Sequence, residues 1–400
     1  MKRFRVGALI LSAMLTCLAG CQTTVSQEKV QANSRWDLAR ARVLASGAEE
    51  ALQLGKLDKA QADAEEALSL APSLPEAHIA MGNIHIERGR FSAAIIQLEK
   101  ALETSPRSAR SAYLLGVAYE KSGNLPEALS AYQRAGRIDQ SSFHATLAQA
   151  EVMAGMGQID QARDLLEGRL DQAGDDPTAY ELLGRLCMIT KDYVRAENYL
   201  RTACVLDDDN PIYHKALGQA HFALGHYREA IKAMSRVVET KDYEASYTVY
   251  VILGESNLAL GRAEPARDAY FTASELSPSE PNVWLGLAKA YLAAREGPRA
   301  VLAAQQAIRL DPENPDAVLL GAYAMIQNGR EAEAAEMLTL AIRHHPDNAM
   351  IRCLLGQALD RSGSKPAARR AYQSALRIDP NLSLAAKLLA RLDEELSRAN

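Results

Sequence analysis

Two pairs of histidines are spaced so that their imidazoles could meet on one face of a helix. His78 and His85 lie seven residues apart, and so do His214 and His221. Paired imidazoles could begin a zinc site, but such a site needs a third protein ligand and an open coordination position. Because both pairs occupy the same two positions of a repeating pattern, we interpret them as half-buried packing residues. The sequence therefore predicts no metal site.

Cysteine is the second residue type that could carry chemistry. Beyond the N-terminal segment the chain has Cys187, Cys204 and Cys353. Cys187 lies late in the first helix of an expected hairpin and Cys204 lies near the end of the second. At about 1.5 Å per residue the two are roughly 10 Å or more apart along the helix axis, which is beyond the reach of a disulfide. We expect all three to be free, small core or groove residues.

Common catalytic motifs are missing from the sequence. It contains no His-Glu-x-x-His, no Gly-x-Ser-x-Gly and no glycine-rich phosphate-binding loop. We therefore expect a protein that is not an enzyme and that uses neither a cofactor nor a small-molecule substrate.

Composition narrows the class of partner. The 400 residues carry 45 basic and 50 acidic side chains, which gives a formal net charge of −5. A nucleic-acid-binding surface needs a clustered basic excess, so this balance argues against a nucleic-acid partner. Apolar residues make up 48% of the chain, which is enough to bury a sizeable core. No run of about 18 apolar residues is present, so no membrane-spanning helix is expected.

The first twenty residues have the pattern of a secretory signal. Lys2, Arg3 and Arg5 precede a mostly apolar run over residues 6–18, which suits the centre of a signal peptide and is too short to span a bilayer. The sequence LAGC that ends at Cys21 resembles the bacterial lipobox. An ordinary secretory signal followed by a coincidental cysteine is the alternative.

The lipobox resemblance implies an anchor. Residues 1–20 would be the lipoprotein signal peptide, and Cys21 would be lipidated as the first residue of the mature chain. The next residue is Gln22 and not the Asp that retains such proteins in the inner membrane, so the implied destination is the periplasmic face of the outer membrane. Residues 21–40 would hold the lipidated cysteine and a tether, because residues 22–35 are polar and lack a pattern.

A period of 34 residues fills most of the remaining chain. Glycines preceded by Met or Leu mark it at Gly82, Gly116, Gly184, Gly218, Gly254 and Gly356. An alanine follows each of them twelve residues later. This pattern resembles the tetratricopeptide repeat (TPR), a hairpin of two helices, A and B. The resemblance implies an all-α fold: a right-handed superhelical solenoid of about ten TPR helix-turn-helix repeats over residues 41–382, with a capping helix at 383–400.

The expected repeats differ in quality. Their first residues are 41, 75, 109, 143, 177, 211, 247, 281, 315 and 349. Two extra residues, Ala245 and Ser246, separate the sixth repeat from the seventh. The fourth repeat, residues 143–176, has the most degenerate pattern, and the first is weak, as expected of a terminal repeat.

The resemblance also implies a binding surface. In TPR proteins helix A lines a concave groove through repeat positions that include 5, 9 and 12. The matching candidate groove residues are Ile79, Asn83, Ile86, Tyr113, Val117, Leu147, Arg185, Met188, Lys215, Gln219, Phe222, Val251, Leu258, Leu285, Lys289, Leu292, Leu319, Tyr323 and Ile326. Positions 5 and 12 are largely apolar, which favours an amphipathic segment laid along the groove. The paired Lys/Asn clamp of chaperone cochaperones is absent as a set, so a C-terminal acidic peptide is not expected.

Two other interpretations of this surface stay open. The apolar side chains could simply pack helix A against its neighbour. Alternatively, a partner could use the convex face or an edge of the solenoid, where charges such as Glu65, Glu66, Arg163 and Arg201 lie. Such charges are usually solvated surface.

A lipobox followed by tandem TPR units resembles two lipoproteins of pilus systems, the Tad/Flp pilus assembly lipoprotein and the type IV pilus pilotin. The resemblance implies a non-enzymatic protein-binding scaffold, anchored to the outer membrane, that assists assembly of a pilus or secretion apparatus. Its partners would be outer-membrane or periplasmic assembly components, and it would contact the membrane through its N-terminal lipid. The alternatives are a regulatory adaptor of periplasmic peptidoglycan synthases or proteases, and a polysaccharide-export scaffold.

Overall fold

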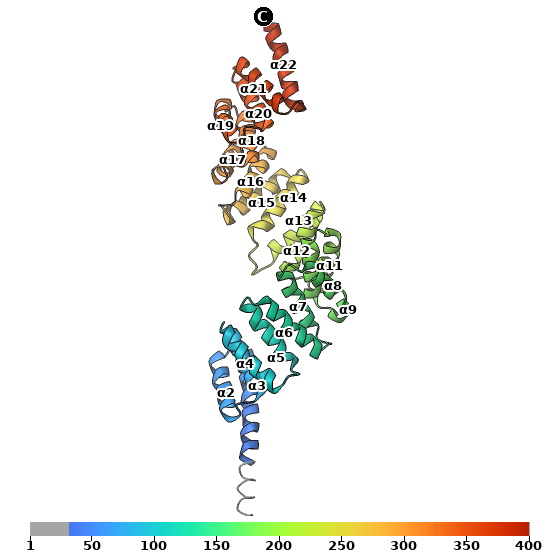
Figure 1. The fold of residues 1–400 in the computed structure, drawn as a ribbon. Coiled ribbons are helices and arrows are strands. Elements are labelled where there is room, and N and C mark those ends of the chain that lie inside the picture. Colours follow the sequence, from blue (N-terminus) through green and yellow to red (C-terminus); the bar gives the residue numbers. More distant parts are fainter. Residues whose placement is uncertain (1–31, 400) are drawn as a thin grey trace, which may run out of the picture. The chain divides into compact units, whose positions relative to one another are not determined.

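The computed structural model describes residues 32–399, with backbone alone at residue 399. Over this range the chain is entirely helical and contains no strand (Figure 1). The expected signal peptide, Cys21 and most of the expected tether lie outside the described residues. The all-α fold is confirmed, and no helix within residues 32–399 is long and apolar enough to cross a membrane.

The repeated element is a helical hairpin, and α3 (Pro75–Glu87) with α4 (Phe91–Thr104) illustrates its origin. Pro75 stands at the first turn of α3, where its missing N–H costs nothing. Gly82 lets the two helices approach closely, because a Cβ at this position would lie 2.6 Å from Cγ of Leu98. Gly89 has a φ of +69° and closes the turn between the helices.

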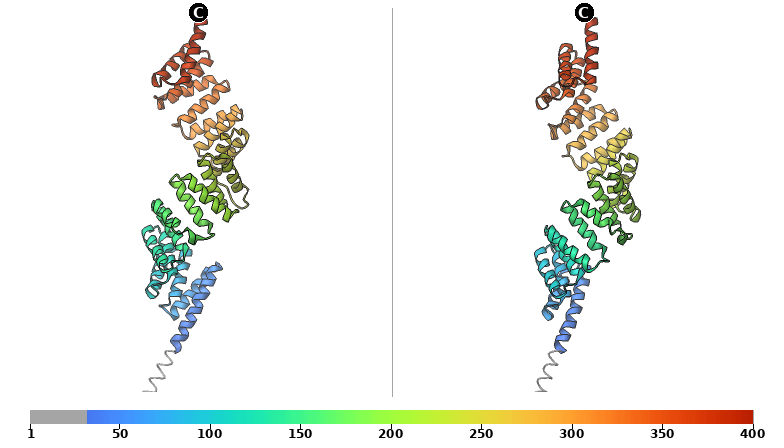
Figure 2. Two further views of the ribbon diagram at one scale, coloured as in Figure 1. Left: turned by 90° about the vertical axis from the view of Figure 1, so that its right-hand side faces the viewer. Right: turned by 45° about the vertical axis from the view of Figure 1, so that its right-hand side comes forward.

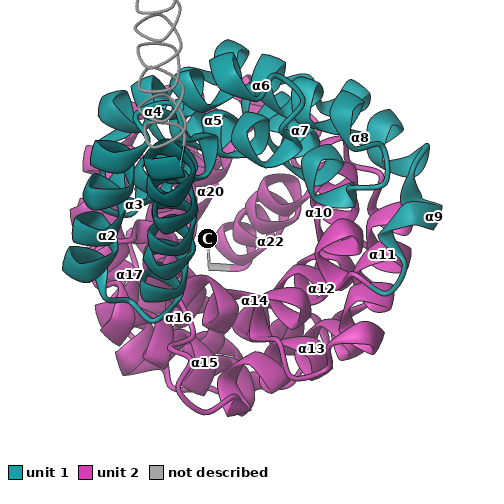
Figure 3. Cartoon of the chain, turned by 90° about the horizontal axis from the view of Figure 1, so that it is seen from below, with its two compact units in different colours: residues 1–175 teal, residues 176–400 magenta. Residues whose placement is uncertain are grey.

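The chain forms two compact units, which are coloured separately in Figure 3. Unit 1 is Met1–Asp175 and unit 2 is Asp176–Asn400. The helices of unit 1 are the one at residues 32–53, α2 (Leu57–Leu70), α3, α4, α5 (Ala109–Lys121), α6 (Leu125–Ile138), α7 (Phe143–Gly155), α8 (Ile159–Glu167) and α9 (Leu170–Ala173).

Unit 2 continues the hairpin pattern. Its helices are α10 (Pro177–Ile189), α11 (Tyr193–Leu206), α12 (Pro211–Ala223), α13 (Tyr227–Glu239), α14 (Tyr247–Ala259), α15 (Ala263–Leu276), α16 (Pro281–Ala293), α17 (Gly297–Leu310), α18 (Pro315–Gln327), α19 (Glu331–His344), α20 (Ala349–Arg361), α21 (Lys365–Ile378) and α22 (Ser383–Ala399). The two extra residues, Ala245 and Ser246, fall in the connection between α13 and α14.

The sequence pattern and the structure differ in two places. Helix formation begins no later than residue 32, so residues 32–40, expected to belong to the tether, extend the helix of the first repeat. In the degenerate fourth repeat, helix B is broken into α8 and α9 at Gly168 and Arg169. The division between the two units, after Asp175, follows this broken helix.

Within each unit, helix A of one repeat contacts helix A of the next, as α3 contacts α5 and α12 contacts α14. Helix B packs against helix A of its own repeat and against helix A of the next repeat. Among the described residues, no comparable contact joins the B helices of successive repeats. The A helices of a unit therefore lie on its inner side. Figure 3 shows this in unit 2, where α12, α14 and α16 lie inside α13, α15 and α17, and Figure 2 shows the stacked hairpins from the side.

Small residues build the core of both units. Alanines such as Ala94, Ala128 and Ala196 are fully buried, as expected of the recurring small position. Larger side chains fill the space opposite the helix A glycines, and Tyr132, Tyr270 and Tyr372 are among the largest fully buried residues. Close helix–helix approach thus comes from pairing a glycine on helix A with a large residue on helix B.

Candidate partner-binding surface

Repeat position 9 supplies several exposed side chains of the inner helices. Arg185 on α10, Lys289 on α16 and Tyr323 on α18 are exposed, with 43% of Tyr323 accessible. Neither the Lys289 side chain nor the Tyr323 side chain makes a hydrogen bond to another described residue, so both side chains are available to a partner. In unit 1 the same position holds Asn83 and Val117, which are half-buried.

Most of the remaining candidates are half-buried. These are Ile86, Tyr113, Leu147, Met188, Lys215, Gln219, Phe222, Val251, Leu258, Leu292 and Leu319. Several of them pack on the core, as Val251, Leu258 and Leu292 do in unit 2. The apolar positions 5 and 12 therefore join neighbouring repeats and offer a partner only part of their surface.

Three candidates do not belong to the surface. Ile79 and Leu285 are 7% and 8% exposed, and Ile326 is fully buried. Each packs between helices of its unit, so none can present its side chain to a bound segment. We remove these three from the candidate groove. Repeat position alone could not distinguish these three from the half-buried candidates, because residues at the same repeat position are buried to different extents in different repeats.

Unit 1 has a small hollow next to one candidate residue. It has a volume of about 290 Å³ and is lined by Arg110, Tyr113, Asp139 and His144, among others. The Tyr113 ring is held in place by the Tyr132 ring, whose centroid lies 5.3 Å away. Sequence reasoning missed Arg110 and His144. Both occupy repeat position 2 of helix A, which belongs to the same face as position 5.

A second hollow lies between helices α15, α16 and α17 of unit 2. It has a volume of about 550 Å³, and its lining includes Phe271, Trp284 and Leu302. Phe271 and Leu302 are 47% and 65% exposed on the two B helices. The outer side of the unit therefore carries apolar surface as well as charge. No sequence pattern predicts this hollow, because its lining residues come from three helices.

The histidines at repeat position 4 bind the backbone. Nε2 of His214 donates to the carbonyl of Asp208 at 2.7 Å, and Nε2 of His78 lies 2.9 Å from the carbonyl of Pro72. Trp284 fills the same position and donates from Nε1 to the carbonyl of Pro278 at 2.8 Å. This position thus ties helix A to the end of the preceding helix B, which is a structural role.

The three cysteines of the described residues, Cys187, Cys204 and Cys353, are buried and form no disulfide with one another. Burial, with Asp208 and Asp207 nearby, raises the pKa of the Cys204 thiol to about 12. Burial raises the pKa of the Cys353 thiol to about 11. Both thiols stay protonated near neutral pH, so neither is activated as a nucleophile.

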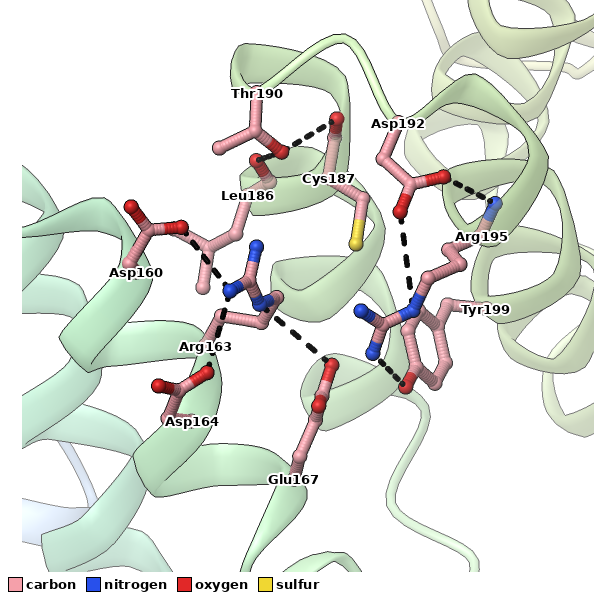
Figure 4. Close-up of polar contacts among 10 residues, drawn as sticks. All are labelled: Asp160, Arg163, Asp164, Glu167, Leu186, Cys187, Thr190, Asp192, Arg195 and Tyr199. Atoms are coloured by element: carbon pink, nitrogen blue, oxygen red, sulfur yellow. Dashed lines mark hydrogen bonds and ion pairs between the residues drawn. The ribbon is translucent and has the colours of Figure 1, made fainter.

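Some charged side chains pair within one helix or at its N-terminus, and Figure 4 shows two separate examples. In α8, Arg163 lies 3.0 Å from Asp160 and 3.3 Å from Asp164. At the start of α11, Asp192 accepts a 3.2 Å hydrogen bond from the backbone N–H of Arg195. Arg163 was expected to be simply solvated, yet its side chain is only 19% exposed and serves this local network.

Family comparisons agree with the repeat pattern. A tetratricopeptide repeat family matches residues 47–105 and 79–142, and a second tetratricopeptide repeat family matches residues 119–186. The family described as the C-terminal domain of cilia and flagella-associated protein 70 matches residues 211–400.

Curated relatives resemble much of this chain but match only part of their own length. Superkiller complex protein 3 of Mus musculus is 24% identical over 302 residues, which are 74% of this chain and 17% of that protein. BBSome complex member BBS4 of Bos taurus is 22% identical over 299 residues, which are 74% of this chain and 56% of that protein. The chain therefore spans less than two thirds of either relative.

Among solved structures, PilF of Pseudomonas aeruginosa has a TM-score of 0.46 and 18% sequence identity, and the match covers 53% of this chain and 94% of that one. The repeat families together match all of residues 47–186, and the hairpins of unit 2 continue the same pattern to residue 378. The chain is a tetratricopeptide-repeat protein.

Proposed function

We propose that the protein is a non-enzymatic scaffold, anchored to the periplasmic face of the outer membrane by a lipid on Cys21, that assists assembly of a pilus or secretion apparatus. The observation that carries the scaffold role is the row of inner helices in unit 2. On these helices the side chains of Lys289 and Tyr323 are exposed and make no hydrogen bond to another described residue. A stack of helical hairpins offers an extended surface of this kind to a protein partner.

The membrane part of the proposal rests on the sequence. The LAGC sequence at residues 18–21 and the basic, apolar and small-residue order before it support lipidation of Cys21. The several acyl chains of a bacterial lipoprotein anchor hold a protein to a membrane far more durably than one chain does. Anchoring would raise the concentration of the inner helices near other membrane proteins.

The pilus assignment rests on the combination of a lipobox with a long TPR array. A regulatory adaptor of periplasmic peptidoglycan synthases or proteases, and a polysaccharide-export scaffold, are the rival assignments. They differ from the pilus assignment in the partner that they require, so identifying the partner decides among them.

The test is crosslinking of the full-length protein in the membranes of its native host, followed by mass spectrometry of the captured proteins. Lys289→Glu combined with Tyr323→Ala changes the inner surface without disturbing the core. Arg343→Glu is the matched control, because Arg343 is an exposed cation on the B helix α19.

We expect a pilus or secretion component to be captured by the native protein and by Arg343→Glu, and to be lost from the double variant. Capture of a cell-wall synthase, a protease or a polysaccharide-export component would replace the pilus assignment. Capture that is unchanged in the double variant would contradict binding at the inner helices. A Cys21→Ser variant that stays in the membrane fraction would contradict the lipid anchor.

A further inference from the structure

Three potential metal ligands meet at the junction of the fifth and sixth repeats in unit 2. Glu197 lies on α11, His221 lies on α12, and His226 lies in the turn between α12 and α13. One ligand atom from each residue lies within 4.8 Å of the other two. Nδ1 of His221 is 3.8 Å from Glu197 Oε1, and Nδ1 of His226 is 3.6 Å from Glu197 Oε2.

The turn of the sixth hairpin brings the two histidines together. Gly225 adopts a φ of +74°, and the backbone N–H of His226 then donates to the carbonyl of His221 at 2.9 Å. The imidazole of His226 is thereby folded back toward that of His221, and the ring centroids are 6.1 Å apart. These two residues are five apart in sequence, a spacing that would not place them together on an uninterrupted helix.

His221 supplies an independent indication of a ligand. The residue is 7% exposed, and its Nδ1 atom is buried without a hydrogen-bond partner in the described part of the chain. Burying a polar atom without a hydrogen-bond partner is energetically unfavourable, so native proteins seldom leave one. This atom faces the carboxylate of Glu197, where a cation would satisfy it.

The donor set fits a zinc ion. Two histidines and one glutamate are the protein ligands of several zinc sites that keep a fourth position open. Ligand atoms about 2.0–2.1 Å from a tetrahedral ion lie roughly 3.4 Å from one another. The three ligand atoms lie within 4.8 Å of one another, so their separations need to shrink by at most about 1.4 Å. The side chain of His226 is 50% exposed, which leaves a path from solvent and room for a water ligand.

An equivalent place in unit 1 lacks the ligands. His85 occupies the repeat position of His221, and its Nδ1 is likewise buried without a hydrogen-bond partner among the residues described. The positions of Glu197 and His226 are filled there by Gln61 and Arg90. The same fold therefore accommodates a glutamine and an arginine at these two positions, which provides a natural template for variants.

Arg201 is the charged neighbour that a metal would have to tolerate. Its guanidinium pairs with Oε1 of Glu197, one helical turn away on α11. The other oxygen, Oε2, faces His226. Arg201 can therefore hold the carboxylate in place through one oxygen while the other binds a cation, which is the role of a positioning residue around a metal site.

We propose that Glu197, His221 and His226 bind one zinc ion, with the fourth position open to water. The ion links helix B of the fifth repeat to helix A and the turn of the sixth. It therefore stabilises this inter-repeat junction of unit 2. The sequence alone predicts no metal site, because the two histidine pairs recur at the same packing positions of the repeat. The cluster escapes that pattern, since Glu197 lies in another repeat and His226 lies outside both pairs.

The test is zinc titration of the full-length protein, first stripped with a chelator and kept reduced, by calorimetry and by thermal unfolding. Glu197→Gln combined with His226→Arg copies the residues found beside His85, so the fold should persist and circular dichroism can verify it. His226→Asn is a smaller change at a half-exposed side chain, for use if the double variant does not fold. His144→Asn, at an exposed histidine of unit 1, is the matched control.

We expect one zinc per chain and a raised unfolding temperature in the native protein and in His144→Asn. Loss of a residue that only hydrogen-bonds to a metal ligand typically weakens metal affinity roughly tenfold to hundredfold. We expect removal of a ligand itself to weaken zinc affinity by more than this. Absence of zinc binding to the native protein would overturn the proposal. Equal affinity in the native protein and the folded ligand variant would overturn it as well, since the ion would then bind elsewhere.

Discussion

The ring of Tyr270 lies between two glycines of unit 2, and this arrangement predicts the effect of adding one methyl group. A Cβ at Gly286 on α16 would lie 2.1 Å from Cε1 and 2.4 Å from Cζ of Tyr270. The ring cannot retreat, because a Cβ position at Gly254 on α14 lies only 2.5 Å from Cδ2 on its other edge. Tyr270 itself is 2% exposed.

The expected cost of Gly286→Ala follows from two opposing effects. Overpacking of a close-packed core costs about 1–3 kcal/mol, and the confined ring places this site at the upper end. Alanine in a helix interior gains up to about 1 kcal/mol over glycine. We therefore expect Gly286→Ala to lower the free energy of unfolding of unit 2 by about 2 kcal/mol.

Trp284 lies two residues from the substitution on α16 and reports local unfolding by fluorescence. Urea titration in a Trp36→Phe background isolates this signal, because the only other tryptophan, Trp36, is 71% exposed. Gly47→Ala is the control: it lies inside a helix, and its Cβ would meet only Asp63 Oδ2 at 3.6 Å. We expect this control to gain about 0.5–1 kcal/mol in circular-dichroism unfolding. A Gly286→Ala protein as stable as the parent would refute the close-approach argument.

Three further predictions concern single residues. Arg295→Gly should raise the stability of unit 2 by about 0.5–1 kcal/mol in urea unfolding, because Arg295 has a φ of +61° at a turn position where most repeats have glycine; lower stability would contradict this. Asp360→Ala should speed hydrogen exchange in α22, because Asp360 is buried and binds Lys365 at 2.8 Å and Arg391 at 3.0 Å; unchanged exchange would mean that the pair does not hold the helix. Burial, with Arg90 and Arg88 nearby, lowers the pKa of His85. The unfolded chain therefore binds a proton at His85 more readily than the folded chain does. The free energy of unfolding should fall as pH drops below about 6.5. The His85→Gln protein should show a shallower loss of stability between pH 7.5 and 5.5, and an identical slope would exclude His85 as its source.

The sequence predicts the repeats well because their signals are local. Glycine opposite a large residue, glycine or a positive φ at the turn, and proline at the first turn of helix A each act within one hairpin. The expected first residues of the repeats therefore coincide with helix starts such as Pro75, Pro211 and Pro315. The broken helix at Gly168 appears in the sequence only as a weak match of the fourth repeat to the 34-residue pattern. The pattern residues are missing there, and nothing in the sequence marks where the helix breaks.

The binding surface and the metal cluster were harder to predict, because they depend on how deeply each repeat packs against its neighbours. Positions 5 and 12 look like an apolar groove in the sequence, yet Ile326 is fully buried and Leu258 packs on the core. The cluster at His221 joins residues from two repeats and a turn. Its geometry follows from the turn at Gly225 and from helix stacking, which single-repeat patterns do not describe.

Photo-crosslinking at Tyr323 is the most direct test of whether a protein partner docks on the inner helices. A photoreactive amino acid would replace Tyr323 in the full-length protein in its host membranes, and the same amino acid at Arg343 on the outer helix α19 would serve as the control. We expect a discrete protein adduct at position 323 and none at position 343. Adducts at both positions, or an adduct only at position 343, would contradict binding at the inner helices.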